Sequence, residues 1–98
     1  MSGRRASVAE TVDPDGRCVW VPASTWNGHV VQEHAEMAGL LDVVVQAVEA
    51  PEHREDDVRP GRRRFYRRLG RRWLRVVLEF EGDEDRLVTA FLQDNDPR

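Results

Sequence analysis

The sequence predicts an α+β domain in which two helices pack on one face of an antiparallel β-sheet. Helix-like spacing of apolar residues is confined to the middle of the chain, between residues 26 and 50. The second half instead alternates as strands do and is interrupted by glycine-containing turns. Because the two patterns are segregated, we expect a short N-terminal strand, two helices, and a meander of three to four antiparallel strands.

One domain is expected from 98 residues, of which 40% are hydrophobic. We interpret residues 1–16 as a disordered N-terminal arm, residues 17–93 as the domain, and residues 94–98 as a frayed polar tail. No stretch approaches the roughly 18 apolar residues of a membrane span, and the first residues lack the apolar core of a secretory signal. Since Cys18 is the only cysteine, no internal disulfide can form, and a cytoplasmic location is the simplest.

The first strand is expected at residues 17–22, a short run of β-forming side chains that ends at Pro22. Ser24 or Thr25 can then cap a helix that begins near Trp26. Four residues of this helix recur on one face at helical spacing, which predicts that the face is buried. They are Val30, His34, Met37 and Leu41.

A second helix is expected at residues 40–50. Gly39 separates it from the first helix, and Pro51 ends it because a proline pushes the preceding Ala50 out of the helical region. Its buried side is expected to comprise Leu40, Leu41, Val44, Val45 and Val48.

Three strands are expected in close succession after the second helix. They are predicted at residues 63–69, 73–81 and 86–93. Pro60-Gly61 marks the turn before them, and Gly70 and the segment 82–85 mark the hairpin loops between them. A short strand around residues 57–59 would add a fourth.

Alternation along the strands predicts which side chains face the helices. Those expected to face them are Leu74, Val76, Leu78, Phe80, Val88, Ala90 and Leu92. Those expected on the opposite face of the last strand are Leu87, Thr89 and Phe91. That opposite face is free of helices in this scheme, and we expect a functional site there.

Nine arginines and no carboxylate lie in the segment from Arg59 to Arg75. The formal net charge of the chain is −3, so removing these nine charges leaves −12 on the rest. A basic segment on an acidic domain is typical of a protein that meets a polyanion on one face. Phe65, Tyr66 and Trp73 lie within it and could stack on unpaired bases. A solvated strand face is the alternative interpretation.

His34 is a candidate general acid or base because it shares the apolar face of the first helix and points toward the sheet. The alternative is a core histidine satisfied by one hydrogen bond. His29 could instead pair with Glu33, one turn later on the helix. The two histidines are about 140° apart on a helix, so they cannot form a helical zinc pair, and no metal or other cofactor is expected.

A regular strand divides the arginines of residues 63–69 between two faces. Arg67 shares one face with Phe65, and Arg64 shares the other with Tyr66. An arginine that faces the helices must be paired or functional, because a buried unpaired guanidinium is too costly to keep. Thr89 places a hydroxyl in the last strand, where a β-branched residue also fits for structural reasons alone.

The motifs occur in a distinctive order. They are Trp26-x-x-His29-x-x-x-x-His34-x-Glu36-Met37, then Arg64-Phe65-Tyr66-Arg67, Leu74-Arg75-Val76-Val77-Leu78, and Val88-Thr89-Ala90-Phe91. In this order they resemble the small PBECR-type domains of the barnase–EndoU–colicin–RelE-like (BECR) superfamily, over residues 19–92. Ala35 stands where the family pattern has a proline.

The resemblance implies a helical N-terminal half packed on an antiparallel sheet, and a metal-independent ribonuclease or toxin-like activity. RNA would be the substrate, and a cognate antitoxin or immunity protein would be a partner. The implied catalytic residues are His34 as acid or base, Arg67, together with Arg64 or Arg75, as the cation that stabilises the phosphorane, and Thr89 as a hydrogen-bond donor to phosphate. The implied substrate-binding residues are Arg64, Tyr66, Arg75, His29 and Phe91.

Two other functions fit the same sequence. A non-catalytic module would use the arginines to bind nucleic acid or an acidic protein, and its binding to nucleic acid would weaken steeply with salt. An interaction or immunity protein would use the acidic segments at residues 52–57 and 83–85. Those acids could also neutralise arginines within one molecule or between the subunits of a homodimer.

Overall fold

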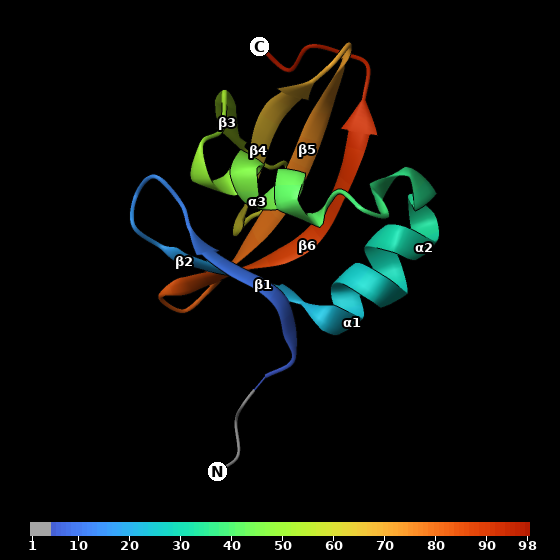
Figure 1. The fold of residues 1–98 in the computed structure, drawn as a ribbon. Helices are drawn as coiled ribbons and strands as arrows, with labels where there is room; N and C mark the ends of the chain where they lie inside the picture. The colour runs from blue at the N-terminus through green and yellow to red at the C-terminus, as the bar shows by residue number, and fades with distance from the viewer. Residues whose placement is uncertain (1–4) are drawn as a thin grey trace.

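The computed structural model describes residues 5–98 and confirms the α+β class. Six strands form one sheet, in the order β1-β2-β6-β5-β4-β3 (Figure 1). The strands are β1 (Ser7–Val12), β2 (Cys18–Pro22), β3 (His53–Asp56), β4 (Arg62–Leu69), β5 (Arg72–Glu81) and β6 (Glu84–Gln93). β2 and β6 run parallel, whereas the other neighbours are antiparallel. The expected purely antiparallel meander of three to four strands is therefore wrong in strand number and in this parallel pair.

The helical part of the chain comprises two segments, joined by a short turn. Residues 23–33 form one helical segment, which comprises α1 (Ala23–Thr25), the π-helix η1 (Trp26–Val30) and α2 (Val31–Glu33). It ends at His34, whose backbone leaves the helical region with φ −132° and ψ 78°. The 3₁₀ turn η2 (Ala35–Met37) follows, and Gly39, with φ +85°, leads into α3 (Leu41–Glu49).

The expected disordered arm at residues 1–16 is wrong where the structure describes it, because residues 7–12 form β1. Residues 1–4 lie outside the described part of the chain. β1 pairs with β2, from Ser7 opposite Pro22 to Val12 opposite Cys18. The side chains of β1 alternate between half-buried and exposed, and Ala9 packs against the core. A fourth strand in the second half was expected around residues 57–59. The structure has this strand, β3, a few residues earlier, at His53–Asp56.

The hydrophobic core lies between α3 and one face of the sheet. α3 contributes Val44, Ala47 and Val48, each at most 1% exposed. The sheet contributes Phe65, Leu74, Val76, Leu78, Leu87 and Ala90, among others. Phe80 was expected to face the helices too. It is instead 46% exposed, and the guanidinium groups of Arg17 and Arg63 lie over its ring.

A β-bulge at Val88 shifts the alternation of β6 by one residue. Val77 pairs with Thr89 and Leu78 pairs with Leu87, which leaves Val88 without a partner. The side expected for Leu87 is therefore wrong, because Leu87 is fully buried in the core. Thr89 keeps the expected side, opposite the core.

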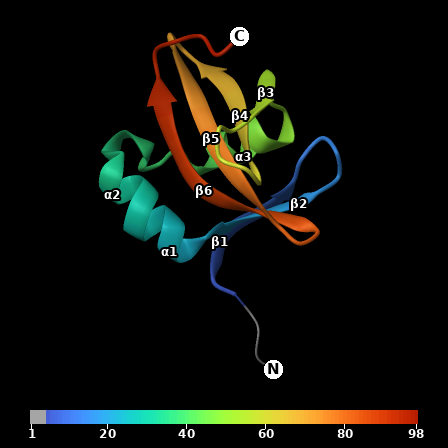
Figure 2. The same cartoon turned by 180° about the vertical axis from the view of Figure 1, so that it is seen from behind.

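The opposite face of the sheet is left open over β4 and β5 within the described residues (Figure 2). The segment 23–33 lies beside β6 along one margin of this face. Residues 94–98 form neither helix nor strand, and the Arg98 guanidinium lies 5.1 Å from the Trp73 ring centroid. No helix in the described part of the chain is long and apolar enough to cross a membrane.

Candidate functional site

A groove of about 470 Å³ lies on the open face of the sheet. β5 and β6 line it with Arg75, Val77, Val88, Thr89 and Phe91. The remaining lining residues are His29 from η1 and Asp57, Val58, Arg59 and Arg62 from the β3–β4 loop and the start of β4. The groove is therefore lined by side chains that come from both halves of the chain.

Arg75 is the central cation of this groove. Its guanidinium carbon lies 5.5 Å from the ring centroid of Tyr66 and 5.1 Å from that of Phe91. Its Nε is buried and has no hydrogen-bond partner within residues 5–98. A buried N–H group of a charged side chain is costly to leave unpaired. Arg63 Nε is in the same state, but the Arg63 guanidinium is paired with Asp13 through Nη2.

Most other arginines of the basic segment that lie on strands are occupied by contacts within the molecule. Arg62 pairs with Glu79, Arg63 with Asp13, Asp15 and Asp85, Arg64 with Glu55 and Asp57, and Arg72 with Asp94. The acids that the sequence suggested as a contact surface are therefore used, in part, to neutralise arginines. Arg67, Arg68 and Arg75 also lie on strands and have no ion pair among the described residues, and Arg75 is the one of these three that lines the groove.

A hydrogen-bonded network lies beside Arg75. Tyr66 is 1% exposed, and its hydroxyl donates to Glu55 over 3.2 Å. Arg64 donates to Glu55 over 3.1 Å and to Asp57 over 2.6 Å. Hydrogen bonds from His53 first, and then from Arg64 and Tyr66, hold the pKa of Glu55 below its usual range. The network fixes the Tyr66 ring against the Arg75 guanidinium.

The same ion pairs shift the other titratable groups of the network. The Arg64 guanidinium lowers the pKa of Asp57, and Asp57 in turn raises the pKa of Arg64. Burial raises the pKa of the Tyr66 hydroxyl. Arg64 is therefore firmly charged but bound to two carboxylates, which leaves it less free than Arg75 to bind a ligand.

The two histidines at residues 29 and 34 differ in their relation to the groove: His29 lines it, whereas His34 is not a lining residue and contacts the lining residue Phe91. The side chain of His29 is 42% exposed, and its Nδ1 lies 2.9 Å from Glu33, in the pairing expected from the sequence. His34 is half-buried, and its ring stacks on Phe91 with 5.2 Å between centroids and 30° between planes. His34 is therefore not sealed in the core but contacts a residue that lines the groove.

Thr89 lies in the groove beside Phe91, on the side of β6 that was expected from the sequence. The bulge at Val88 changes the residues before Thr89: Leu87 turns into the core, and Val88, which was expected to face the helices, lines the groove. Thr89 is half-buried and lies opposite Val77 on the neighbouring strand. Its hydroxyl thus lies on a strand that is paired with its neighbour in the sheet, which suits a group that must position a ligand.

Arg67 lies on the other face of the sheet, on the side of Phe65 and the core. Its Nη1 donates to the carbonyl oxygen of Ala50 over 2.8 Å, at the C-terminal end of α3. A cation at that end of a helix is structurally favourable. The structure therefore does not bring Arg67 together with His34 and Thr89, whereas Arg75 lines the groove with Thr89.

Sequence reasoning missed the part of the groove that comes from the β3–β4 loop. Pro60-Gly61 indicated a turn, but a turn signal does not show where the loop lies relative to the sheet. Within the described residues, no group of three or more His, Cys, Asp or Glu side chains could hold a metal ion. The groove offers arginine, histidine and threonine, which are side chains suited to an anion.

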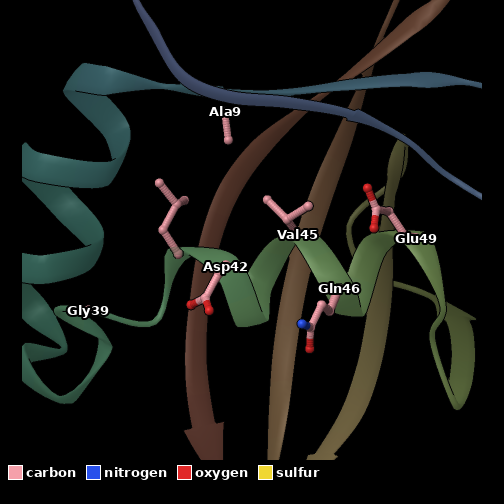
Figure 3. A pocket seen from close by; sticks show the side chains of 7 residues that line it. Ala9, Gly39, Asp42, Val45, Gln46 and Glu49 are labelled. Atoms are coloured by element: carbon pink, nitrogen blue, oxygen red, sulfur yellow. The ribbon is translucent and has the colours of Figure 1, made fainter.

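A larger hollow of about 610 Å³ lies on the core side of the molecule, between α3 and β1 (Figure 3). Ala9, Leu41 and Val45 provide its apolar surface, so Leu41 and Val45 are less buried than their helical spacing predicted. Its only charged residues are Asp42 and Glu49. Two carboxylates and no cation make this hollow unsuitable for a phosphate group.

Comparison with known proteins adds no assignment: no protein-family model, curated protein or solved structure matches the chain. The chemistry of the groove therefore stands on its own residues. The groove combines an arginine that lacks a partner, a hydroxyl, an imidazole and an aromatic ring, which are the components of a site for a nucleotide phosphate.

Proposed function

We propose that the chain is a small metal-independent endoribonuclease of the BECR type, and that the groove holds the scissile phosphate of RNA. The observation that carries this proposal is Arg75, which lines the groove and has neither an ion pair nor a hydrogen-bond partner for its Nε within residues 5–98. Phosphate is a suitable partner because a guanidinium binds it through strong, directional, charge-assisted hydrogen bonds.

The proposed reaction is a transesterification within the RNA strand. The 2′-oxygen loses its proton to a base and attacks the adjacent phosphorus, while the bond from phosphorus to the 5′-oxygen breaks and that oxygen takes a proton from an acid. The products are a 2′,3′-cyclic phosphate and a 5′-hydroxyl. His29 and His34 provide the two imidazole groups that such a reaction uses, one as base and one as acid.

The other groove residues have supporting roles in this proposal. Arg75 stabilises the negative charge that builds up on phosphorus, in the role that the family resemblance gave to Arg67. Thr89 donates a hydrogen bond to a phosphate oxygen. Phe91, which is half-buried, provides the ring beside the base. Tyr66 is only 1% exposed, so its ring contacts the Arg75 guanidinium and not the base.

Cleavage of an RNA with one reactive position tests the proposal. The substrate is a single-stranded oligonucleotide that is 2′-O-methylated everywhere except at one internal nucleotide. We expect one cut at that nucleotide, a 2′,3′-cyclic phosphate on the product, and the same rate with and without EDTA. Arg75→Gln should slow the cut by about 100-fold. Arg67→Gln is the matched control and should stay within about twofold of the wild type.

The second candidate is RNA binding without cleavage. Arg75 favours it because an unpartnered guanidinium accounts for phosphate binding without any proton transfer. This function predicts salt-sensitive binding that Arg75→Gln abolishes, while the unmodified nucleotide stays intact. Cleavage that persists unchanged in Arg75→Gln would contradict the proposed nuclease site.

A further inference from the structure

A second row of side chains, which also contains a cation and an aromatic ring, lies on the open face two residues away from the groove along each strand. The groove row comprises Tyr66, Arg75 and Phe91, which lie side by side across β4, β5 and β6. The hairpin row comprises Arg68, Trp73 and Gln93, in the same register. Residues two apart on a strand share a face, so the hairpin row lies on the same side of the sheet as the groove.

Arg68 in the hairpin row is exposed and held in place by its neighbours. Its guanidinium carbon lies 5.7 Å from the Trp73 ring centroid, and its Nε donates to the carbonyl oxygen of Gly70 over 3.1 Å. Neither of its terminal nitrogens has a hydrogen-bond partner in residues 5–98. Trp73 is only 2% exposed, so it supports Arg68 and is not itself open to a base.

The hairpin end carries more positive than negative charge. Its cations are Arg67, Arg68, Arg71, Arg72 and Arg98, and its acids are Glu52, Asp94 and Asp96. Arg72 pairs with Asp94 over 3.2 Å, and Arg98 pairs with Asp96 over 3.0 Å. Glu52 accepts the backbone N–H of Arg68 over 2.6 Å. The charge of Arg68 is a lesser cause of the lowered pKa of Asp96, but Arg68 forms no ion pair among the described residues, so Arg68 and the exposed Arg71 are the cations available to a ligand here.

We infer that the hairpin row is a second phosphate subsite, which binds the phosphate next to the scissile one along a single RNA strand. Two residues along a strand span about 7 Å, so the two rows are spaced for consecutive phosphates of an extended strand. This inference rests on the proposed function. It specifies the ligand as a single strand with at least two phosphodiesters, since a base that stacks beside Phe91 must be unpaired.

Binding of short oligonucleotides tests the second subsite. Fluorescence anisotropy would measure the affinity for 2′-O-methyl oligouridylates of increasing length, from the dinucleotide with one phosphodiester upward; these RNAs lack the attacking hydroxyl and stay intact. Addition of the second phosphodiester should raise the affinity of the wild type about tenfold. Arg68→Gln should abolish this increase and reduce the slope of log affinity against log salt by about 0.7.

Arg72→Gln is the matched control for this experiment. Arg72 has the same charge and lies in the same hairpin, but it pairs with Asp94 and its neighbour Trp73 faces the other way. The Arg72→Gln variant should still bind more tightly when the second phosphodiester is added, as the wild type does. Arg71→Gln, at an exposed turn position, is a second variant and should reduce the increase in part. Thermal melting of each variant shows that it is folded.

The outcomes separate the two levels of inference. If Arg68→Gln and Arg72→Gln bind all lengths alike, the second subsite is overturned, while dependence of the dinucleotide on Arg75 still supports the groove. If the wild type binds no oligonucleotide at low salt, or if Arg75→Gln binds as the wild type does, the proposed function is overturned together with the second subsite.

Discussion

Arg63 pairs with Asp13 across the sheet, with 3.0 Å between Nη2 and Oδ2, although the Asp13 side chain is completely buried. The other carboxylate oxygen of Asp13 accepts the backbone N–H groups of Asp15 and Arg17, each over 2.9 Å. Arg63 also reaches the buried Asp85 over 3.5 Å. These contacts tie the β1–β2 turn to β4 and to the start of β6.

Replacement of Arg63 should therefore destabilise the folded protein. Arg63→Leu is expected to lower the free energy of unfolding by about 3 kcal/mol, because it leaves the buried carboxylate of Asp13 without its cation, whereas Asp85 keeps its pair with Arg17. Urea denaturation measures this change. Arg72→Leu breaks the exposed pair with Asp94 and should cost less than about 1 kcal/mol. Equal losses in both variants would contradict a special role for Arg63.

The Arg63 contacts also explain why β1 was not predicted. The hairpins of β4, β5 and β6 follow from local alternation and from glycines at their turns, so the sequence predicts them well. In residues 7–12 the large apolar side chains are Val8 and Val12, and both are exposed. The turn that follows is held by a cation 50 residues away from Asp13. A partner at that separation leaves no local pattern, and the segment therefore looked disordered.

Arg67 should matter for stability and not for RNA cleavage. Arg67→Ala removes the hydrogen bond to the carbonyl oxygen of Ala50 and is expected to cost about 1 kcal/mol of unfolding free energy. The cleavage rate should remain within about twofold of that of the wild type. Urea denaturation and the single-cut RNA assay measure the two effects on the same preparation. A large loss of cleavage in a well-folded variant would restore Arg67 to the site.

The contrast between Arg67 and Arg75 shows how far the site could be predicted. Alternation already grouped Arg67 with Phe65, but the sequence does not show which face of β4 the helix covers. The structure decides this, because Phe65 is fully buried against the core. The bulge at Val88 could not be predicted from the sequence either. It moves Leu87 to the other face of the sheet, and no glycine or proline nearby indicates a bulge.

The turn between β4 and β5 should depend on Gly70. Its φ of +64° lies in the left-handed region, and it occupies the first position of a two-residue hairpin loop. Gly70→Ala is expected to cost about 1 kcal/mol of stability, seen as a lower thermal midpoint. Gly28→Ala is the control, because Gly28 is helical and an added Cβ there meets open space. It should be neutral or slightly stabilising.

The ion pair between Asp57 and Arg64 should make stability fall in acid. The Arg64 guanidinium holds the pKa of Asp57 below its usual range, so the folded protein binds this proton less readily than the unfolded chain does. The stabilisation is thus present above the unfolded pKa of about 4, and it is lost as the pH falls through the lower folded pKa. Glu55, whose pKa is also lowered, adds to the effect in the same direction.

Asp57→Asn tests this pH dependence because it removes the titrating group and keeps the shape of the side chain. The variant should be less stable than the wild type at pH 7, and the difference should shrink as the pH falls from about 5 toward 3. Urea denaturation at successive pH values measures both curves. Asp56→Asn, at an exposed neighbouring residue, should be about as stable as the wild type at each pH. A constant gap between Asp57→Asn and the wild type would show that the pair with Arg64 does not control the acid response.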